Sequence, residues 1–256
     1  MRVVILAGGF GTRLSEETSL RPKPMAEVGE KPILWHIMKI YGAYGFNDFV
    51  ICAGYKSYMI KEYFQNYWLH NCDVTFDMRS HEVEIHEDST ESWRVTVVDT
   101  GHDTMTAGRL KRVRDYIGDG TFMLTYGDGV ADIDVSALLE YHRAQGKQAT
   151  LTAVQTLGRF GALELDEAGA VFEFTEKPHG DGQWINGGFF VMEPSVIDRI
   201  HGDETVLERE TLPSLAVDSQ LAAFRHSGFW QPMDTLRDKR LLEQLWDSGH
   251  APWKVW

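Results

Sequence analysis

The stretch Leu-Ala-Gly-Gly-Phe-Gly-Thr-Arg-Leu occupies residues 6–14 and follows directly on the apolar run Val3-Val4-Ile5. A short apolar run bounded by glycine predicts a buried strand, and glycine lets the chain turn sharply after it. The backbone amides of a glycine-rich turn point toward anionic oxygens, and an arginine adds further donors. The stretch therefore predicts a phosphate-binding loop after the first strand, and the residues that follow decide its type.

Two well-known phosphate-binding loops do not fit these residues. The dinucleotide fingerprint G-x-G-x-x-G needs a third glycine inside a helix, where this chain has Leu14. The helix itself is excluded, because Pro22 and Pro24 lie one residue apart and cannot both occupy a helix interior. The P-loop needs Gly-Lys followed by Ser or Thr, and no Gly-Lys pair in the chain is followed by either.

A glycine loop that stays extended and wraps over a triphosphate accounts for the same residues. Arg13 supplies a rigid fork of donors for phosphate oxygens. Lys23 is predicted to lie on a stiff, extended segment between Pro22 and Pro24, where it loses little entropy on meeting a phosphate. Either cation alone is better explained as a solvated surface residue. The prediction therefore rests on the glycines, the arginine and the proline-flanked lysine together.

Strand-like runs alternate with helical patterns along much of the chain. Apolar residues recur at helical spacing in residues 33–44, 56–67 and 135–144, and a last helix runs from about residue 235 to 248. Strand-like runs lie at residues 3–6, 49–52, 122–125 and 149–154. This alternation predicts an α/β fold with a Rossmann-like mixed, mostly parallel sheet and helices on both faces. No linker or repeat divides the chain, so a single domain over residues 1–256 is predicted.

Two regions depart from this alternation. Residues 71–103 alternate as strands do and carry a series of acidic side chains: Asp73, Asp77, Glu82, Glu84, Glu87, Asp88 and Glu91. We interpret this region as an acidic β-hairpin insertion outside the central sheet, which packs against a neighbouring subunit or closes over the nucleotide. Residues 160–192 are also strand-like, with a turn at residues 167–169. The central α/β unit is therefore expected to carry small β-hairpin insertions.

Charge and composition exclude several classes of partner. The formal net charge is −13, which argues against broad electrostatic attraction to nucleic acid or to an anionic membrane. No stretch approaches the roughly 20 apolar residues of a membrane span. The chain contains two cysteines, Cys52 and Cys72, too far apart for a Cys-x-x-Cys motif. Two isolated thiols in a chain of 256 residues are typical of a reduced, cytoplasmic protein.

The quoted loop and its sequel resemble the signature of the sugar-1-phosphate nucleotidyltransferases, a GGxGTRL loop followed by a proline-lysine element. Five further segments occur in the order of that family: TYGDG (125–129), FGALELD (160–166), TEKP (175–178), NGGFFVM (186–192) and FWQPMDTLRDK (229–239). The resemblance covers nearly the whole chain. It implies the nucleotidyltransferase fold and assembly as a homo-oligomer, while the net charge predicts no nucleic-acid or membrane partner.

Within that family, the segments TYGDGVAD, WINGGFFV and GFWQPMDTLRDK are most similar to members that use CTP and glucose 1-phosphate. The implied reaction joins these substrates into CDP-glucose and diphosphate, assisted by Mg²⁺, for dideoxy sugars of bacterial surface polysaccharide. Two alternatives remain open. One is the same chemistry with dTTP or UTP, and the other is a regulatory homologue that binds sugar nucleotide without turnover.

The resemblance also implies roles for individual residues around the bond that forms. Arg13, Lys23 and Asp128 correspond to catalytic positions, and Asp128 and Asp234 to the metal ligands. Two carboxylates suffice for Mg²⁺, which keeps waters and substrate phosphates as its other ligands. Each aspartate also has a purely structural interpretation. Asp128 suits a tight turn and Asp234 suits the N-cap of the last helix.

The remaining implied residues divide between the two substrates. The nucleotide site comprises Leu6, Ala7, Gly8, Gly9, Phe10, Gly11, Thr12, Arg13, Lys23, Thr104, Arg109 and Gly127. The sugar-phosphate site comprises Glu176, Lys177, Asn186, Gly187 and Trp230. Two alternatives stay open here. Glu176 and Lys177 are also compatible with an exposed ion pair, and Trp230 with a core aromatic.

Overall fold

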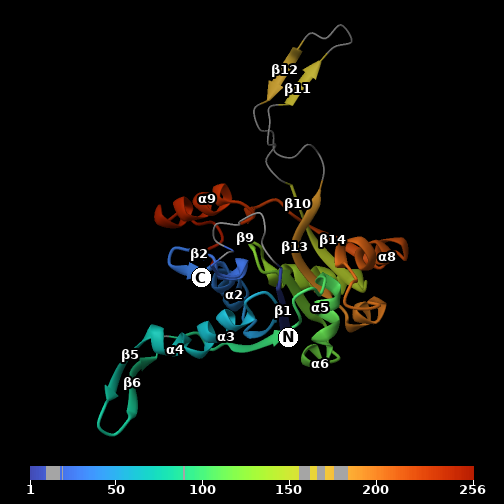
Figure 1. Cartoon of the computed structure of the whole chain (residues 1–256). Helices are drawn as coiled ribbons and strands as arrows, with labels where there is room; N and C mark the ends of the chain where they lie inside the picture. Colours follow the sequence, from blue (N-terminus) through green and yellow to red (C-terminus); the bar gives the residue numbers. More distant parts are fainter. Residues whose placement is uncertain (10–17, 19, 89, 156–161, 166–170, 176–183) are drawn as a thin grey trace.

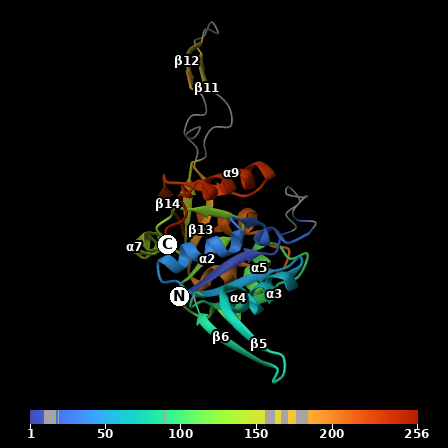
Figure 2. The same cartoon turned by 90° about the vertical axis from the view of Figure 1, so that its left-hand side faces the viewer.

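A seven-stranded sheet forms the centre of the molecule (Figures 1 and 2). The computed structural model describes residues 1–9, 18, 20–88, 90–155, 162–165, 171–175 and 184–256. The strands of the sheet, in spatial order, are β14 (Leu221–His226), β10 (Ala149–Val154), β13 (Ile185–Met192), β8 (Phe122–Tyr126), β1 (Arg2–Ala7), β4 (Asp48–Ala53) and β7 (Arg94–Asp99).

The sheet is mixed but mostly parallel. Parallel pairs join β1 to β4 and β8, β4 to β7, and β10 to β14. Strand β13 is antiparallel to both of its neighbours, β8 and β10, and so runs against the other six strands. The predicted fold class is confirmed by this topology. As a consequence, the amino end of β13 lies at the same sheet edge as the carboxyl ends of β1 and β8.

Helices cover both faces of the sheet, because the side chains of its central strands are apolar on both sides. In β1, Val3 and Ile5 belong to one core, and Val4 and Leu6 to the other. The first core is covered by α2 (Ile33–Ala43), α3 (Ser57–Gln65), α7 (Val135–Gln145) and α9 (Leu236–Asp247). The second is covered by α5 (Thr106–Arg112), α6 (Arg114–Ile117), η3 (Pro194–Arg199), η4 (Leu207–Thr211) and α8 (Leu212–Val217).

The acidic insertion is shorter than the sequence pattern predicts. Short helix α4 (Tyr67–Asn71) leads into an antiparallel hairpin of β5 (Cys72–Asp77) and β6 (Glu82–Asp88), which projects from the body in Figure 1. Residues 94–99, predicted to belong to the insertion, instead form β7 and pair with β4 at the edge of the central sheet. An edge strand is half-exposed, so apolar and polar residues alternate along it as they do along an exposed hairpin. The sequence pattern therefore does not distinguish the two.

Three further ribbons lie outside the sheet. Strands β2 (Glu27–Val28) and β3 (Lys31–Pro32) form one, and β11 (Ala162–Leu165) and β12 (Val171–Thr175) form another, as the pattern up to residue 176 predicts. The last part of the strand-like region 160–192 instead forms β13 inside the central sheet. The third joins β9 (Gly129–Ala131) to β15 (Trp230–Pro232), with Trp230 opposite Ala131. This last ribbon brings the chain after β8 beside the chain before α9, although about 100 residues separate them.

A buried histidine fixes the segment that leads into the site. The His36 side chain, fully buried in α2, donates through Nε2 to the Val28 carbonyl oxygen at 2.8 Å and accepts at Nδ1 from Trp253 Nε1 at 3.3 Å. Burial lowers the pKa of His36 to about 4, so the ring is neutral near pH 7 and can fill both roles. The ribbon next to Lys23 is thereby tied to α2 and to the C-terminal tryptophans.

Candidate active site

Strands β1 and β8 end side by side and deliver two glycine-containing turns to one edge of the sheet. Leu6 lies opposite Tyr126, and the Gly127 amide donates to the Leu6 carbonyl oxygen at 3.0 Å. Gly8 follows β1 at a position where a Cβ atom would lie 2.2 Å from Arg109 Nη1, so a larger residue would have to displace the Arg109 guanidinium. In open α/β sheets this edge, at the carboxyl ends of parallel strands, is where ligands bind.

Arg109 lies beneath the first of these turns. The residue is 5% exposed, and its guanidinium donates to the Thr100 hydroxyl at 2.8 Å and to the carbonyl oxygens of Gly101 and His102 at 2.7 and 3.2 Å. Burial lowers the pKa of Arg109, although the group remains a cation at neutral pH. Arg109 therefore supports Gly8 from below, and its contact with a nucleotide, like that of Thr104, stays a prediction.

The centre of the site is a lysine between two carboxylates. Lys23 Nζ lies 2.7 Å from Asp128 Oδ2 and 2.6 Å from Asp234 Oδ1, and the lysine side chain is 11% exposed. Burial alone would lower the pKa of Lys23, but the two carboxylates outweigh it, so the net shift is upward. Both aspartate side chains are about one-third exposed, at 34% and 36%, so the carboxylates also face outward.

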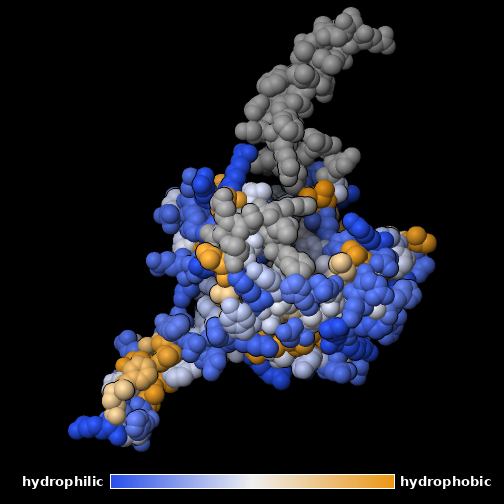
Figure 3. Space-filling model, in the orientation of Figure 1, coloured by the Kyte–Doolittle hydropathy of each residue, from blue (hydrophilic) through white to orange (hydrophobic). Residues whose placement is uncertain are grey.

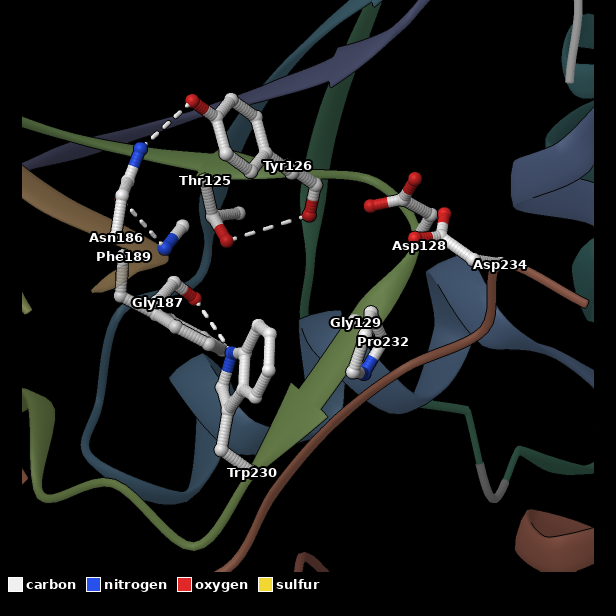
Figure 4. Close-up of a pocket in the computed structure, with 11 residues that line it drawn as sticks. Thr125, Tyr126, Asp128, Gly129, Asn186, Gly187, Phe189, Trp230, Pro232 and Asp234 are labelled. Atoms are coloured by element: carbon white, nitrogen blue, oxygen red, sulfur yellow. Dashed lines mark hydrogen bonds between the residues drawn. The ribbon is translucent and has the colours of Figure 1, made fainter. Parts of the chain in front are cut away.

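The two aspartates meet because of the ribbon of β9 and β15. The Met233 amide donates to the Asp128 carbonyl oxygen at 2.7 Å, which places Asp234 beside Asp128 (Figure 4). Asp234 is not the N-cap of the last helix. Thr235 caps α9 in a reciprocal capping box with Asp238, which leaves the Asp234 carboxylate to pair with Lys23.

Lys23 reaches this position from a turn and not from an extended segment. Residues 23–25 form the short 3₁₀ helix η2, with Pro22 as its N-cap in an extended conformation. A proline in the first turn of a helix costs little, because its missing N–H has no partner there in any case. Pro24 and Met25 are buried, so the turn that carries Lys23 is fixed by packing.

A pocket opens beside the aspartates and is lined from four strands, β8, β9, β13 and β15 (Figure 4). Asn186 and Gly187 enter it from β13, Tyr126 from β8, and Trp230 from β15. The Trp230 indole N–H donates to the Gly187 carbonyl oxygen at 2.7 Å. The half-buried ring both lines the pocket and packs against the core, and its contact with a sugar stays a prediction. Tyr126 and Pro232 also line the pocket, and the only signal for them in the sequence is that they lie within the TYGDG and FWQPMD segments.

The two carboxylates fit a hard divalent cation. They are oxygen ligands that already converge on one positive charge, Lys23 Nζ, at the mouth of a pocket. No cluster of three or more His, Cys, Asp or Glu side chains occurs in the part of the chain that the structure describes. A cation bound here would therefore depend on water and substrate for its other ligands, as Mg²⁺ commonly does.

Comparison with known proteins shows the family to which the chain belongs. The model of the nucleotidyl transferase family matches residues 2–235. The chain belongs to the nucleotidyl transferase family. Glucose-1-phosphate cytidylyltransferase of Salmonella typhi is 61% identical over the full length of both chains. A probable glucose-1-phosphate cytidylyltransferase of Bacillus subtilis is 48% identical, again over both full lengths. The family and the enzyme class predicted from the sequence, a nucleotidyltransferase, are thereby confirmed.

Solved structures extend the nucleotidyl transferase comparison to the fold. HddC from Yersinia pseudotuberculosis aligns with a TM-score of 0.69 at 22% identity, covering 96% of this chain and 99% of that one. At this identity the likeness concerns the fold alone. Six of the predicted site residues, Phe10, Gly11, Thr12, Arg13, Glu176 and Lys177, lie outside the residues that the structure describes.

Proposed function

We propose that this nucleotidyltransferase makes CDP-glucose and diphosphate from CTP and α-D-glucose 1-phosphate. The observation that carries the proposal is the convergence of Lys23, Asp128 and Asp234 beside a pocket. The full-length identity of 61% to a glucose-1-phosphate cytidylyltransferase supports the choice of substrates.

The reaction asks the protein for positioning and charge compensation. A phosphate oxygen of glucose 1-phosphate attacks the α-phosphorus of CTP, a new P–O bond forms, and the bond to the bridging oxygen of the leaving diphosphate breaks. Two anions must approach each other in a protein of net charge −13, so local cations are needed. Lys23 supplies one of them at the edge of the sheet where β1 ends and Gly8 and Gly9 follow.

Asp128 and Asp234 are the residues that would hold Mg²⁺. When bound, this ion neutralises charge on the triphosphate and orients it. Lys23 then has two sets of possible partners, the carboxylates and the phosphates, and we propose that it moves to the phosphates. Asn186 and Trp230 lie on the other side of the same pocket. There they offer a donor–acceptor amide and an aromatic face to a sugar ring.

A substrate panel tests this function. The purified chain is incubated with glucose 1-phosphate, Mg²⁺ and each of CTP, UTP, dTTP, ATP and GTP, and diphosphate release is followed. We expect kcat/KM to be highest with CTP. Preference for UTP or dTTP would contradict the choice of nucleotide, and sugar-nucleotide binding without turnover with any triphosphate would identify a regulatory homologue.

We further propose that the chain is cytoplasmic and forms a homo-oligomer through the hairpin of β5 and β6. Cys52 and Cys72 form no disulfide, in keeping with a reducing compartment. No described helix has the length and apolar character to cross a membrane. Apolar side chains gather on the hairpin in Figure 3, with exposures of 52% at Phe76, 79% at Met78 and 48% at Ile85. Such a patch is typical of a protein contact.

Shortening the hairpin tests this assembly. Replacing residues 74–86 by a short Gly-Ser linker is expected to reduce the oligomer size, measured by light scattering during size-exclusion chromatography. A second variant, Met78→Ser with Phe76→Ser, keeps the hairpin and removes its apolar tip, so it serves as the matched test of the contact. An unchanged mass in both variants would show that the hairpin does not form the interface.

A further inference from the structure

We propose that Glu208 is a positioning residue for the sugar side of the pocket, acting through Tyr126 on Asn186. The inference rests on the proposed function, because it concerns the group that would hold the sugar of glucose 1-phosphate. Glu208 lies in η4, a single π-helical turn at residues 207–211, outside the described lining of the pocket. Its carboxylate nevertheless connects the pocket to Thr106, the first residue of α5.

Each oxygen of the Glu208 carboxylate accepts a hydrogen bond from a hydroxyl group. The Tyr126 hydroxyl donates to Oε1 at 2.5 Å, and the Thr106 hydroxyl donates to Oε2 at 2.8 Å. Each hydroxyl also receives an N–H. The Asn186 side-chain amide donates to Tyr126 at 3.0 Å, and the Leu207 backbone amide donates to Thr106 at 2.9 Å. A carboxylate can only accept hydrogen bonds, so both hydroxyls must donate to Glu208. Each hydroxyl oxygen is then left to accept from an N–H group, which fixes the direction of every hydrogen bond in the series.

The tyrosine is held rigidly in this relay. Its ring packs edge-on against Phe190 at a centroid distance of 5.7 Å and over Gly188. A Cβ at Gly188 would lie 2.6 Å from Tyr126 Cδ2, and the φ of +79° at this position also favours glycine. Burial raises the pKa of Tyr126, so the phenol stays protonated and donates a hydrogen bond to Glu208.

The consequence is a fixed orientation of the Asn186 amide. Its Oδ1 accepts from the Gly188 backbone amide at 2.9 Å, and its Nδ2 donates to Tyr126, so the amide cannot flip without losing both bonds. One N–H and one lone pair of the amide remain beyond these two bonds. Asn186 lines the pocket, so this donor and acceptor are available to adjacent hydroxyls of a sugar.

The other arm of Glu208 is reinforced independently. Thr106 is the first residue of α5, and this end of the helix is also tied by backbone bonds from Met105 to Asp203 at 2.8 Å and from Ala107 to Thr205 at 3.2 Å. The start of α5, which lies on the side of the predicted nucleotide site, should therefore keep its position when Glu208 is replaced. We expect the effect of Glu208 to fall mainly on the sugar substrate.

Kinetics of three variants test the relay. Tyr126→Phe and Glu208→Ala are each expected to raise the KM for glucose 1-phosphate about tenfold, the size of one lost, well-placed hydrogen bond. The kcat and the KM for CTP should stay within about twofold of the wild-type values. Glu208→Gln keeps one acceptor oxygen, so it should raise the KM for glucose 1-phosphate by less. Its amide nitrogen cannot accept a hydrogen bond from the second hydroxyl, so some rise should remain.

The double variant Tyr126→Phe with Glu208→Ala separates a relay from two independent structural roles. A relay predicts that the double variant is no worse than Tyr126→Phe alone, whereas independent roles predict effects that multiply. Glu204→Gln is the matched control, an exposed glutamate four residues away that should be neutral. Tyr126→Phe removes only the hydroxyl and keeps the packing of the ring. If Glu208→Ala fails to fold, the KM of Tyr126→Phe alone still tests the relay.

The outcomes distinguish this inference from the proposed function. A wild-type chain that does not turn over glucose 1-phosphate overturns the proposed function and this inference with it. An active wild type in which Tyr126→Phe leaves the KM for glucose 1-phosphate unchanged overturns the inference alone. Equal rises in the KM of both substrates would likewise overturn it, because they indicate a general disturbance of the site.

Discussion

Replacing Asp128 by asparagine is expected to lower kcat by about 100-fold or more while the chain stays folded. The carboxylate is one of two that converge on Lys23, and the substitution removes its negative charge without changing its shape. Less charge at this point means weaker retention of Mg²⁺ and poorer alignment of the triphosphate. The expected signature is a rise in the Mg²⁺ concentration needed for half-maximal rate, together with a lower kcat at saturating Mg²⁺.

A control for Asp128 exists at the other end of the same strand. Asp119 lies before β8 and its side chain is fully exposed, so Asp119→Asn makes the same chemical change far from the carboxyl edge of the sheet. Turnover of Asp119→Asn should match that of the wild type. Steady-state rates measured across a Mg²⁺ series compare the two variants. A normal kcat and Mg²⁺ dependence in Asp128→Asn would remove this residue from the site.

The central sheet could be predicted because its signals are local. The run Val3–Ala7 before Gly8 is apolar at every position, which is the pattern of a strand buried on both faces, and the structure places β1 in the interior of the sheet, between β8 and β4. The extent of the hairpin could not be predicted in the same way. Residues 94–99 form an edge strand, and the alternating pattern of an edge strand equals that of an exposed hairpin.

The role of Asp234 was open in the sequence, although a decisive signal was present. Aspartate and threonine are both good N-caps, so either Asp234 or Thr235 could begin the last helix. A capping box needs an acidic or amide side chain three residues after the cap, and Asp238 stands in that relation to Thr235. Three residues after Asp234 the chain has Arg237. The spacing thus assigns the cap to Thr235.

Glu208, in contrast, could not be found from the sequence. It lies 82 residues from Tyr126 and 102 from Thr106, and only the fold brings the three together. A glutamate within Leu-Glu-Arg-Glu-Thr is ordinary for an exposed helix, so nothing in its neighbourhood marks it. Long-range hydrogen bonds between side chains leave no periodic pattern, which is why the support of a site is less predictable than its loops.

Replacing Lys23 by methionine is expected to lower kcat/KM for CTP by about 100-fold, the scale for removing one partner from a desolvated charge pair. Methionine keeps most of the length and apolar stem of lysine, which is 11% exposed here, so packing against the turn of residues 23–25 is retained. The loss should appear mainly in the KM for CTP if the ammonium moves to the triphosphate. The KM for glucose 1-phosphate should change by less than about threefold.

A second measurement on the same variant separates the two partners of Lys23. In the free protein the ammonium lies 2.7 and 2.6 Å from the carboxylates of Asp128 and Asp234, where it would compete with a divalent cation for the same oxygens. Without it, two carboxylates face each other uncompensated, so Lys23→Met should bind Mn²⁺ more tightly than the wild type in the absence of nucleotide. Mn²⁺ binding can be followed by electron paramagnetic resonance.

Lys147→Met is the matched control, because Lys147 follows α7 and precedes β10 at the opposite edge of the sheet. Both its CTP kinetics and its Mn²⁺ affinity should equal those of the wild type. Weaker Mn²⁺ binding in Lys23→Met would mean that the lysine holds the two carboxylates in place for the metal instead of competing with it. A normal KM for CTP would show that Lys23 pairs only with the two carboxylates. Another cation, from the residues that follow β1, would then have to bind the triphosphate.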